Sequence, residues 1–274
     1  YGDNASRIFV GYLHEVEAAD FMQGYVEYTL ICLDVKGLMK KNSVYQVSGS
    51  KKVQQILSEI LSTECYRDFI EEKKVDPLPE AMNQDCMIKG ETHYDWLCSL
   101  AARMDYEFIC GRGQVLFQNS RRKGAQTLEL RVEYGLQEVR GIVTMTEQTG
   151  KIQICGYNRK DEKVMGTAEW PGISGPFAKK MKQALQGCEL IFWDMELENG
   201  EQAKQRAKAR MNQRVGNCAC MKAAAIGIPE LLPGICVELV NGTAESLSGE
   251  IYVQEVRHLL DENGYRTIVK GVRL

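Results

Sequence analysis

The sequence predicts a mainly β protein with an α+β insertion between two sets of strands. Three observations predict this class. β-branched and aromatic residues alternate with polar ones near both ends of the chain, at 7–34 and 250–269. Helical spacing of apolar residues is clearest in between, from 50 to 104. The 25 glycines and only 6 prolines suit turns and bulges between strands that keep their backbone donors.

Composition and charge bound the class of function. With 34 basic and 37 acidic residues, the net charge of −3 argues against a dedicated nucleic-acid binder. A chain of 274 residues with 44% hydrophobic residues can bury two packed modules or one large one. No run approaches the roughly 20 apolar residues of a membrane span, so we expect a soluble protein. The ten cysteines lie mostly in apolar runs, which predicts reduced core residues and folding in a reducing cytoplasm.

The two ends of the chain predict similar hairpins. Residues 7–16 and 25–34 read as one pair of strands, and residues 250–256 and 265–269 as another, with a turn at 261–264. Ile8-Phe9-Val10 ahead of Gly24-Tyr25 echoes Ile251-Tyr252-Val253 ahead of Gly264-Tyr265. Duplicated β-modules would produce this echo, and so would the alternation that every amphipathic hairpin shares. Both explanations stay open at this level.

The middle of the chain predicts helices and a short hairpin. Residues 50–61 form an amphipathic helix with Ser50 as its N-cap, and 76–79 an extended connector into a short strand near Met87. Thr92 caps a second helix at 93–104, whose apolar face consists of Trp96, Leu97, Leu100 and Ala101. A hairpin follows, with strands at 106–110 and 114–117 and a turn at 111–113.

The last third returns to strands, at 138–146, 151–157, 218–226 and 234–240. A glycine-rich loop at 172–176 precedes a basic segment at 179–182. Residues 201–214 predict a helix with a narrow face of small residues, ended by Gly216. Five basic side chains lie on two ridges of that helix and could meet phosphates, but a solvated or subunit-facing helix is favoured. These side chains are Lys204, Lys208, Arg206, Arg210 and Arg214.

The sequence carries no familiar catalytic signature, so we predict no catalytic, cofactor-binding or metal-binding residue. Gly111-Arg112-Gly113 is a turn rather than a nucleotide loop. Cys218 and Cys220 suit packing on one strand face, and a Cys98 or Cys65 nucleophile beside His93 lacks an orienting carboxylate. The remaining candidates are the three separated histidines His14, His93 and His258 and the alternating acids Asp194, Glu196 and Glu198, which favour a solvated strand face over paired hydrolytic carboxylates.

Three passages resemble a known family. Residues 94–108, with Trp96, two leucines and an Ala-x-Arg stretch before an aromatic strand, are similar to the late control D family of phage tail proteins, the baseplate hubs. Residues 227–234, and 249–258 with Gly264-Tyr265 after them, match the closing strands of that family's second barrel. The hub of the type VI secretion valine-glycine-repeat spike proteins is of the same kind, and the order of the passages agrees over 7–274.

The resemblance implies two related β-barrel modules joined by a helix-containing segment. Residues 1–48 are then part of the first barrel, whose opening strands we expect to precede Tyr1. Residues 49–125 form the α/β connector and residues 126–274 the second barrel.

The resemblance also implies a function without chemistry and without cofactors. Three chains form a ring with pseudo-sixfold symmetry that adapts a trimeric spike, a separate protein, to a hexameric tail tube or tube-initiator protein. A tape-measure protein is a further expected partner, and neither membrane anchoring nor specific nucleic-acid binding is expected. The location is the tail baseplate of a contractile phage, tailocin or injection particle assembled in the bacterial cytoplasm. The alternative is a tail-associated cell-wall hydrolase or endopeptidase.

Overall fold

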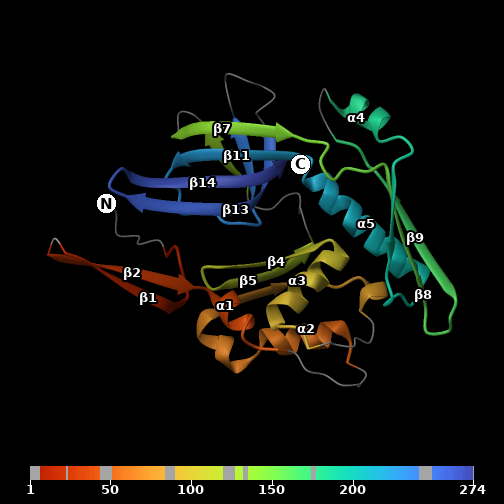
Figure 1. Ribbon diagram of the computed structural model, residues 1–274, viewed down its shortest axis with the longest axis horizontal. Coiled ribbons are helices and arrows are strands. Elements are labelled where there is room, and N and C mark those ends of the chain that lie inside the picture. Colours follow the sequence, from red (N-terminus) through yellow and green to blue (C-terminus); the bar gives the residue numbers. More distant parts are fainter. Residues whose placement is uncertain are drawn as a thin grey trace. The chain divides into compact units, whose positions relative to one another are not determined.

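The computed structural model describes residues 7–22, 24–43, 51–83, 90–119, 127–131, 135–173, 177–240 and 249–273. The chain forms two compact units. The first comprises Tyr1–Leu100 and Glu107–Gln118, and the second comprises Ala101–Tyr106 and Asn119–Leu274. The mainly β class with inserted helices is confirmed (Figure 1). The predicted module boundaries near 48 and 125 fall outside the described residues and stay predictions.

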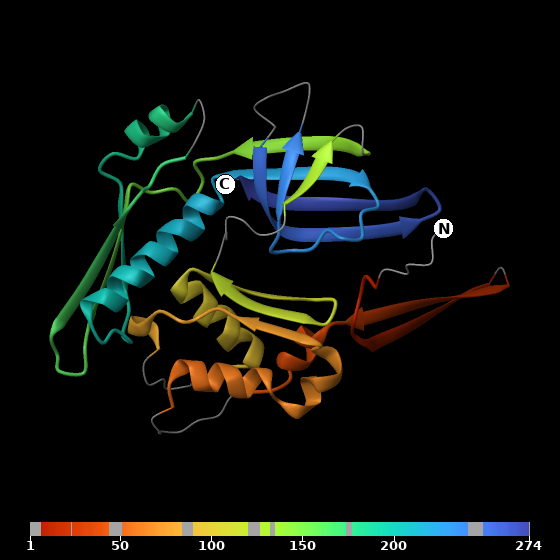
Figure 2. The same cartoon turned by 180° about the vertical axis from the view of Figure 1, so that it is seen from behind.

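The first unit begins with an antiparallel hairpin of β1 (Tyr12–Phe21) and β2 (Tyr25–Leu33). Gly24 adopts a φ of 92° in the turn, which favours glycine, and its N–H donates to the Phe21 carbonyl. The pairing register shifts between Leu13 and Glu15, so one extra residue bulges from β1. In Figures 1 and 2 the hairpin extends away from the helices of its own unit.

Helices α1 (Val35–Met39) and α2 (Val53–Leu61) follow the hairpin. The Asp34 carboxylate caps α1 by accepting the Lys36 N–H. The predicted apolar face of α2 is confirmed, because five of its residues are buried: Val53, Ile56, Leu57, Ile60 and Leu61. The helix starts later than predicted, with Lys52 as its N-cap, and Ser50 lies outside the described residues. A 3₁₀ helix, Glu64–Phe69, connects α2 to the next strand of the chain.

A three-stranded sheet in the order β3-β5-β4 completes the first unit. Its strands are β3 (Glu72–Val75), β4 (Tyr106–Gly111) and β5 (Gln114–Asn119), with β3 parallel to β5. The predicted β4–β5 turn is confirmed, because Arg112 and Gly113 both have positive φ, at 52° and 83°. The short strand predicted near Met87 falls on residues that the structure does not describe, and a 3₁₀ turn at Glu80–Met82 precedes them.

Helix α3 (His93–Met104) carries the apolar face that the sequence predicts. Trp96, Leu97, Leu100 and Ala101 are all at most 7% exposed. The capping prediction also holds, because the Thr92 hydroxyl accepts the Asp95 N–H at 3.1 Å.

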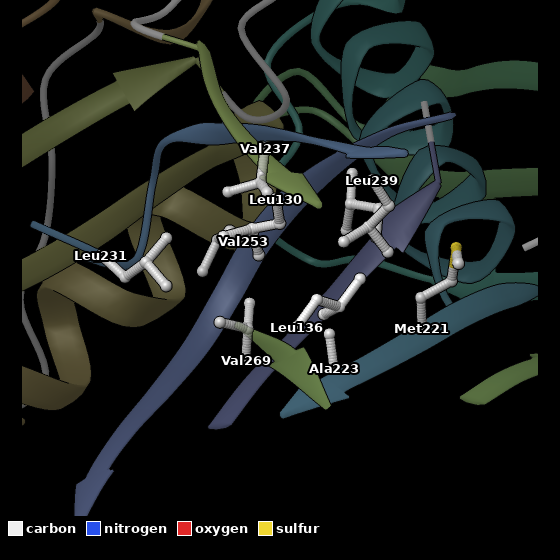
Figure 3. Packing of buried hydrophobic residues seen from close by; sticks show 10 residues of the cluster. Leu130, Leu136, Met221, Ala223, Leu231, Val237, Leu239, Val253 and Val269 are labelled. Atoms are coloured by element: carbon white, nitrogen blue, oxygen red, sulfur yellow. The ribbon is translucent and has the colours of Figure 1, made fainter. Parts of the chain in front are cut away.

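A curled six-stranded sheet dominates the second unit, in the order β6-β12-β13-β14-β11-β7. Its strands are β6 (Thr127–Arg131), β7 (Leu136–Val143), β11 (Ala219–Ile226), β12 (Cys236–Val240), β13 (Gly249–Asp261) and β14 (Gly264–Arg273). The concave side holds a core to which all six of these strands contribute, and Figure 3 shows Leu130, Val237 and Val253 among its side chains. The predicted final hairpin is therefore confirmed as β13–β14, in the middle of this sheet.

A smaller sheet, β10-β8-β9, and helix α5 form the rest of the second unit. The strands are β8 (Lys151–Tyr157), β9 (Lys163–Glu169) and β10 (Glu189–Trp193), with the short helix α4 (Ala178–Ala184) before β10. Helix α5 (Gly200–Gly216) begins at an Asn199 cap, and its small-residue face packs on β8 and β9 through Ala203, Ala207 and Met211. Gly166 allows this approach, since a Cβ there would lie 2.1 Å from the Lys204 backbone nitrogen.

We predict that Trp96→Ala lowers the free energy of unfolding by about 3 to 5 kcal/mol, because it leaves a large cavity under α3. Chemical denaturation monitored by circular dichroism measures the change. Met195→Ala is the control, since Met195 is 81% exposed and its removal should change stability little. Equal stability of Trp96→Ala and the parent would show that α3 is not part of the core.

Candidate assembly surfaces

The β1–β2 hairpin exposes an unusual amount of apolar surface. Leu13, Val16 and Leu30 are 54%, 53% and 62% exposed, and most of their neighbours are exposed as well. Among the described residues, no third strand pairs with the outer edge of β1 or β2. A two-stranded hairpin is marginally stable alone in water, so this one requires further contacts.

The two faces of the hairpin differ in chemistry. Cross-strand pairing sets Val16 opposite Leu30 and Ala18 opposite Tyr28 on one face. The other face carries three carboxylates, those of Glu15, Glu17 and Glu27, together with Ile31 and the stacked rings of Phe21 and Tyr25. Asp20 lies on the first face, beside the turn. The bulge at residue 14 brings Leu13 onto the apolar face with Val16, since an extra residue resets the alternation. Both faces thus expose apolar side chains, and the face with Leu13, Val16 and Leu30 has the fewer carboxylates. Among the residues described, nothing pairs with or covers most of either face.

The hairpin β13–β14 repeats this design inside the six-stranded sheet. Its register shifts between Val253 and Glu255, so residue 254 bulges seven residues before the last paired residue of its strand, just as residue 14 does in β1. Counted from that bulge, the Val16–Leu30 pair corresponds to Val256–Val269. Alternating polarity alone does not place a bulge, so the shared position favours duplication over chance.

The two copies differ in what covers them. In β13–β14, Val253 and Val269 are at most 3% exposed, and β12 and β11 pair with the two outer edges. In β1–β2, the equivalent residues Leu13 and Leu30 are exposed. The same element thus lies in a core in one unit and on a surface in the other.

A second apolar surface lies on the small sheet, on the side away from α5. Ile191, Trp193 and Met165 are 57%, 63% and 50% exposed there, and the rings of Tyr157 and Trp193 stack with their centroids 6.2 Å apart. β10 is an edge strand. Exposed apolar residues that gather on one sheet face are typical of a contact surface.

The acids that the sequence predicts on a strand, Asp194, Glu196 and Glu198, lie after β10 ends at Trp193. This prediction of a strand face is wrong, because Asp194 turns to the buried Arg206 guanidinium of α5. Burial alone would raise the pKa of Asp194, but the hydrogen bonds and charge of Arg206 hold it below its usual value of 3.8. The carboxylate therefore holds α5 to the segment that follows β10.

The basic helix is not a single phosphate-binding face. Arg206 pairs with Asp194, and Arg214 donates to the Glu147 carbonyl. The Arg210 guanidinium lies over the Phe192 ring, 4.0 Å from its centroid. Lys204 and Lys208 are exposed on another side of the helix. Three of the five cations thus take part in packing within the unit. The predicted solvated or subunit-facing helix is therefore only partly right, because α5 packs on its own sheet and leaves Lys204 and Lys208 exposed.

The three histidines lie apart and two of them take part in local hydrogen bonds. His93 Nδ1 is 2.8 Å from the Tyr66 hydroxyl; burial lowers the pKa of His93 and raises that of Tyr66 to about 12. His258 Nδ1 lies 2.9 Å from the Tyr265 hydroxyl and Nε2 lies 3.2 Å from the Leu231 carbonyl. His14 occupies the β1 bulge. Among the described residues, no three His, Cys, Asp or Glu side chains gather as metal ligands would.

The thiols divide into exposed and buried groups. Cys218 is buried and its Sγ lies 3.2 Å from the Thr144 carbonyl, while Cys220 packs beside Cys236 and Tyr252. Burial raises the pKa of Cys110 to about 12 and that of Cys236 to about 11. The nine cysteines that the structure describes are all free thiols. No helix in the described part of the chain combines the length and apolar character needed to cross a bilayer.

Comparisons with known proteins identify the fold. No family model matches the chain, and no curated protein matches it. Among solved structures, a tail protein from Neisseria meningitidis is 12% identical with a TM-score of 0.72, covering 97% of this chain and 80% of that one. The 43 kDa tail protein of prophage MuSo2 from Shewanella oneidensis is 17% identical with a TM-score of 0.67, covering 97% and 79%.

A component of the Escherichia coli type VI secretion system, described as similar to the T4 tail proteins gp27 and gp5, also shares the fold. It is 11% identical with a TM-score of 0.60, and the match covers 96% of this chain and 60% of that one. These likenesses extend over nearly the whole chain, so the fold of each unit is similar to parts of tail and secretion proteins.

We predict that Asp194→Asn lowers the free energy of unfolding by about 2 kcal/mol at pH 7, because it leaves the Arg206 charge poorly paired. Since the pKa of Asp194 is lowered in the folded state, its contribution is complete above the unfolded value and is lost as the pH falls through the folded value. The difference from the parent should therefore shrink below pH 3.8. Denaturation at several pH values measures it, with Glu138→Gln at an exposed pair as control.

We also predict unequal alkylation of the thiols. Iodoacetamide reacts with thiolates, so exposed Cys65 should be modified quickly at pH 8, while Cys110 and Cys236 should react only after unfolding. Mass spectrometry of peptides before and after guanidinium treatment provides the comparison. Fast modification of Cys110 in the native protein would contradict the burial described above.

Proposed function

We propose that this chain is a structural protein of a phage tail, tailocin or related injection apparatus, and that it serves there as the baseplate hub. The observation that carries the proposal is the fold shared with tail and type VI secretion proteins over 96–97% of the chain. The two related hairpins support it, since two similar elements per chain give six positions in a ring of three chains. Such a ring would match a trimeric spike on one side and a hexameric tube on the other.

The exposed hairpin and the exposed face of the small sheet further support the proposal that this chain is part of a multi-protein assembly. Both are apolar surfaces of the kind that proteins bury against partners. The partners we propose are two further copies, a separate spike protein, and a tube or tube-initiator protein, with a tape-measure protein in the tube. The location is the tail or injection particle, assembled in the bacterial cytoplasm.

The role is mechanical rather than catalytic in this proposal. His93 and His258, the two histidines that a hydrolase could use, are hydrogen-bonded to Tyr66 and Tyr265. We therefore expect no cleavage of peptidoglycan by the purified chain. Cleavage that is lost in His93→Ala or His258→Ala variants, while these remain folded, would favour the tail-associated hydrolase instead.

The assembly test is the mass of the particle. We expect multi-angle light scattering to give three copies of this chain per spike trimer when the chain is co-expressed with the products of the adjoining tail genes. The isolated chain should associate toward the same trimer as its concentration rises. A defined complex with another ratio would overturn the hub role and leave the fold assignment intact.

A further inference from the structure

We propose that the β1–β2 hairpin of one copy extends the small sheet of a second copy by pairing β1 with the open edge of β10. The inference rests on the proposed ring and names the surfaces that close it. In this interface, the exposed hairpin of one copy contacts the exposed apolar face of the small sheet of the second copy.

The exposed side chains and edges of the β1–β2 hairpin indicate which properties its partner must have. The equivalent residues Val253 and Val269 are in a core, flanked by strands on both outer edges, whereas Leu13 and Leu30 are bare. A partner must therefore supply an adjoining strand and an apolar neighbour. It must also carry positive charge, because residues 12–33 hold four carboxylates, on Glu15, Glu17, Asp20 and Glu27, and no lysine or arginine.

β10 offers an open strand edge. At the two ends of its parallel pairing with β8, the Lys151 N–H donates to the Cys188 carbonyl and the Asp194 N–H donates to the Cys155 carbonyl. Alternate residues of a parallel strand bond to the same neighbour, so the backbone groups of Glu189, Ile191 and Trp193 point to the other side. Within the described residues, no strand pairs with that side.

The side chains on and beside β10 match the hairpin. Ile191 and Trp193 on the outer face would continue the apolar face of the hairpin once the strands pair. On the α5 side, the exposed Arg210 lies over Phe192 of β10 and would meet the carboxylate face. The segment just before β10 adds three exposed lysines, Lys179, Lys180 and Lys182 of α4. Pairing β1 with β10 thus places apolar side chains beside apolar ones and the basic side chains of α4 and α5 beside the carboxylates of the hairpin.

β1 is the better partner strand because it carries three of the four carboxylates. The contact is head-to-tail, since each copy offers its hairpin to one neighbour and its β10 edge to the other. A heterologous contact of this kind closes into a ring when the rotation permits. Three copies would satisfy every hairpin and every β10 edge.

Charge exchange tests the pairing. We expect Glu15→Lys with Glu17→Lys, or Lys182→Glu with Arg210→Glu, to weaken self-association at least about tenfold in sedimentation equilibrium. The chain carrying all four substitutions should return to within about threefold of the parent. Glu255→Lys, at the position of Glu15 in the duplicate hairpin, is the matched control and should leave association unchanged.

A second variant tests the strand edge itself. Ile191→Pro removes an N–H from the open edge and leaves the bonds to β8, so it should abolish assembly, while Ile191→Val should preserve it. Circular dichroism and thermal melting establish that each variant is folded. Self-association that resists both the charge exchange and the proline would overturn this interface, as would a parent that stays monomeric at every concentration and with tail partners.

The outcomes separate the two proposals. A complex of three copies per spike trimer that is insensitive to these substitutions leaves the hub function standing and removes the β1–β10 interface. Self-association that depends on these charges, combined with a ratio other than three copies per spike trimer, supports the β1–β10 interface and overturns the hub function. Restoration only by an unrelated tail protein would assign the hairpin to that protein instead of a second copy, and would also overturn the inference.

Discussion

A β-hairpin buries its apolar face only when other strands or helices lie against it, and this constraint organises the molecule. The chain contains the same hairpin twice, with the bulge at the same place in each. In the second unit, β11 and β12 flank the hairpin and a core fills its concave side. In the first unit the described residues supply no such strands. The first hairpin therefore leaves apolar side chains exposed that its counterpart in the second unit buries.

Buried polar groups in the chain serve packing. Asp194 and Arg206 neutralise each other where α5 meets the small sheet, and the hydrogen bond lowers the pKa of the acid against the effect of burial. His93, the first residue of α3, shares a hydrogen bond with Tyr66. Polar residues used in this way hold neighbouring elements together.

The fold is shared with proteins that are only 11–17% identical to this chain. The properties of β-sheets explain how one fold persists at such low sequence identity. A sheet tolerates many apolar side chains at an inward position, provided that the alternation and the turn geometry persist. Gly24 with its φ of 92° and the bulges at residues 14 and 254 belong to that geometry.

The sequence by itself determined most of the secondary structure and the burial of α3. The apolar spacing of Trp96, Leu97 and Leu100 and the alternation in β13 and β14 are local patterns, and local periodicity is what a sequence displays directly. It also indicated a similarity between the two hairpins, and the pairing register then showed that both carry a bulge at the same position. The same local reasoning failed at Asp194, where alternating acids resembled a strand and a distant arginine decided the conformation.

Only the tertiary structure decided which apolar residues are covered. Val16 and Val256 look alike in the sequence, yet one lies on a bare hairpin and the other beside a core. The order of strands in a sheet joins residues that are far apart in the chain, as when β7 pairs with β11 and β6 with β12. Sheet order, open edges and cation placement beside β10 are set by these distant contacts, and so no local pattern encodes them.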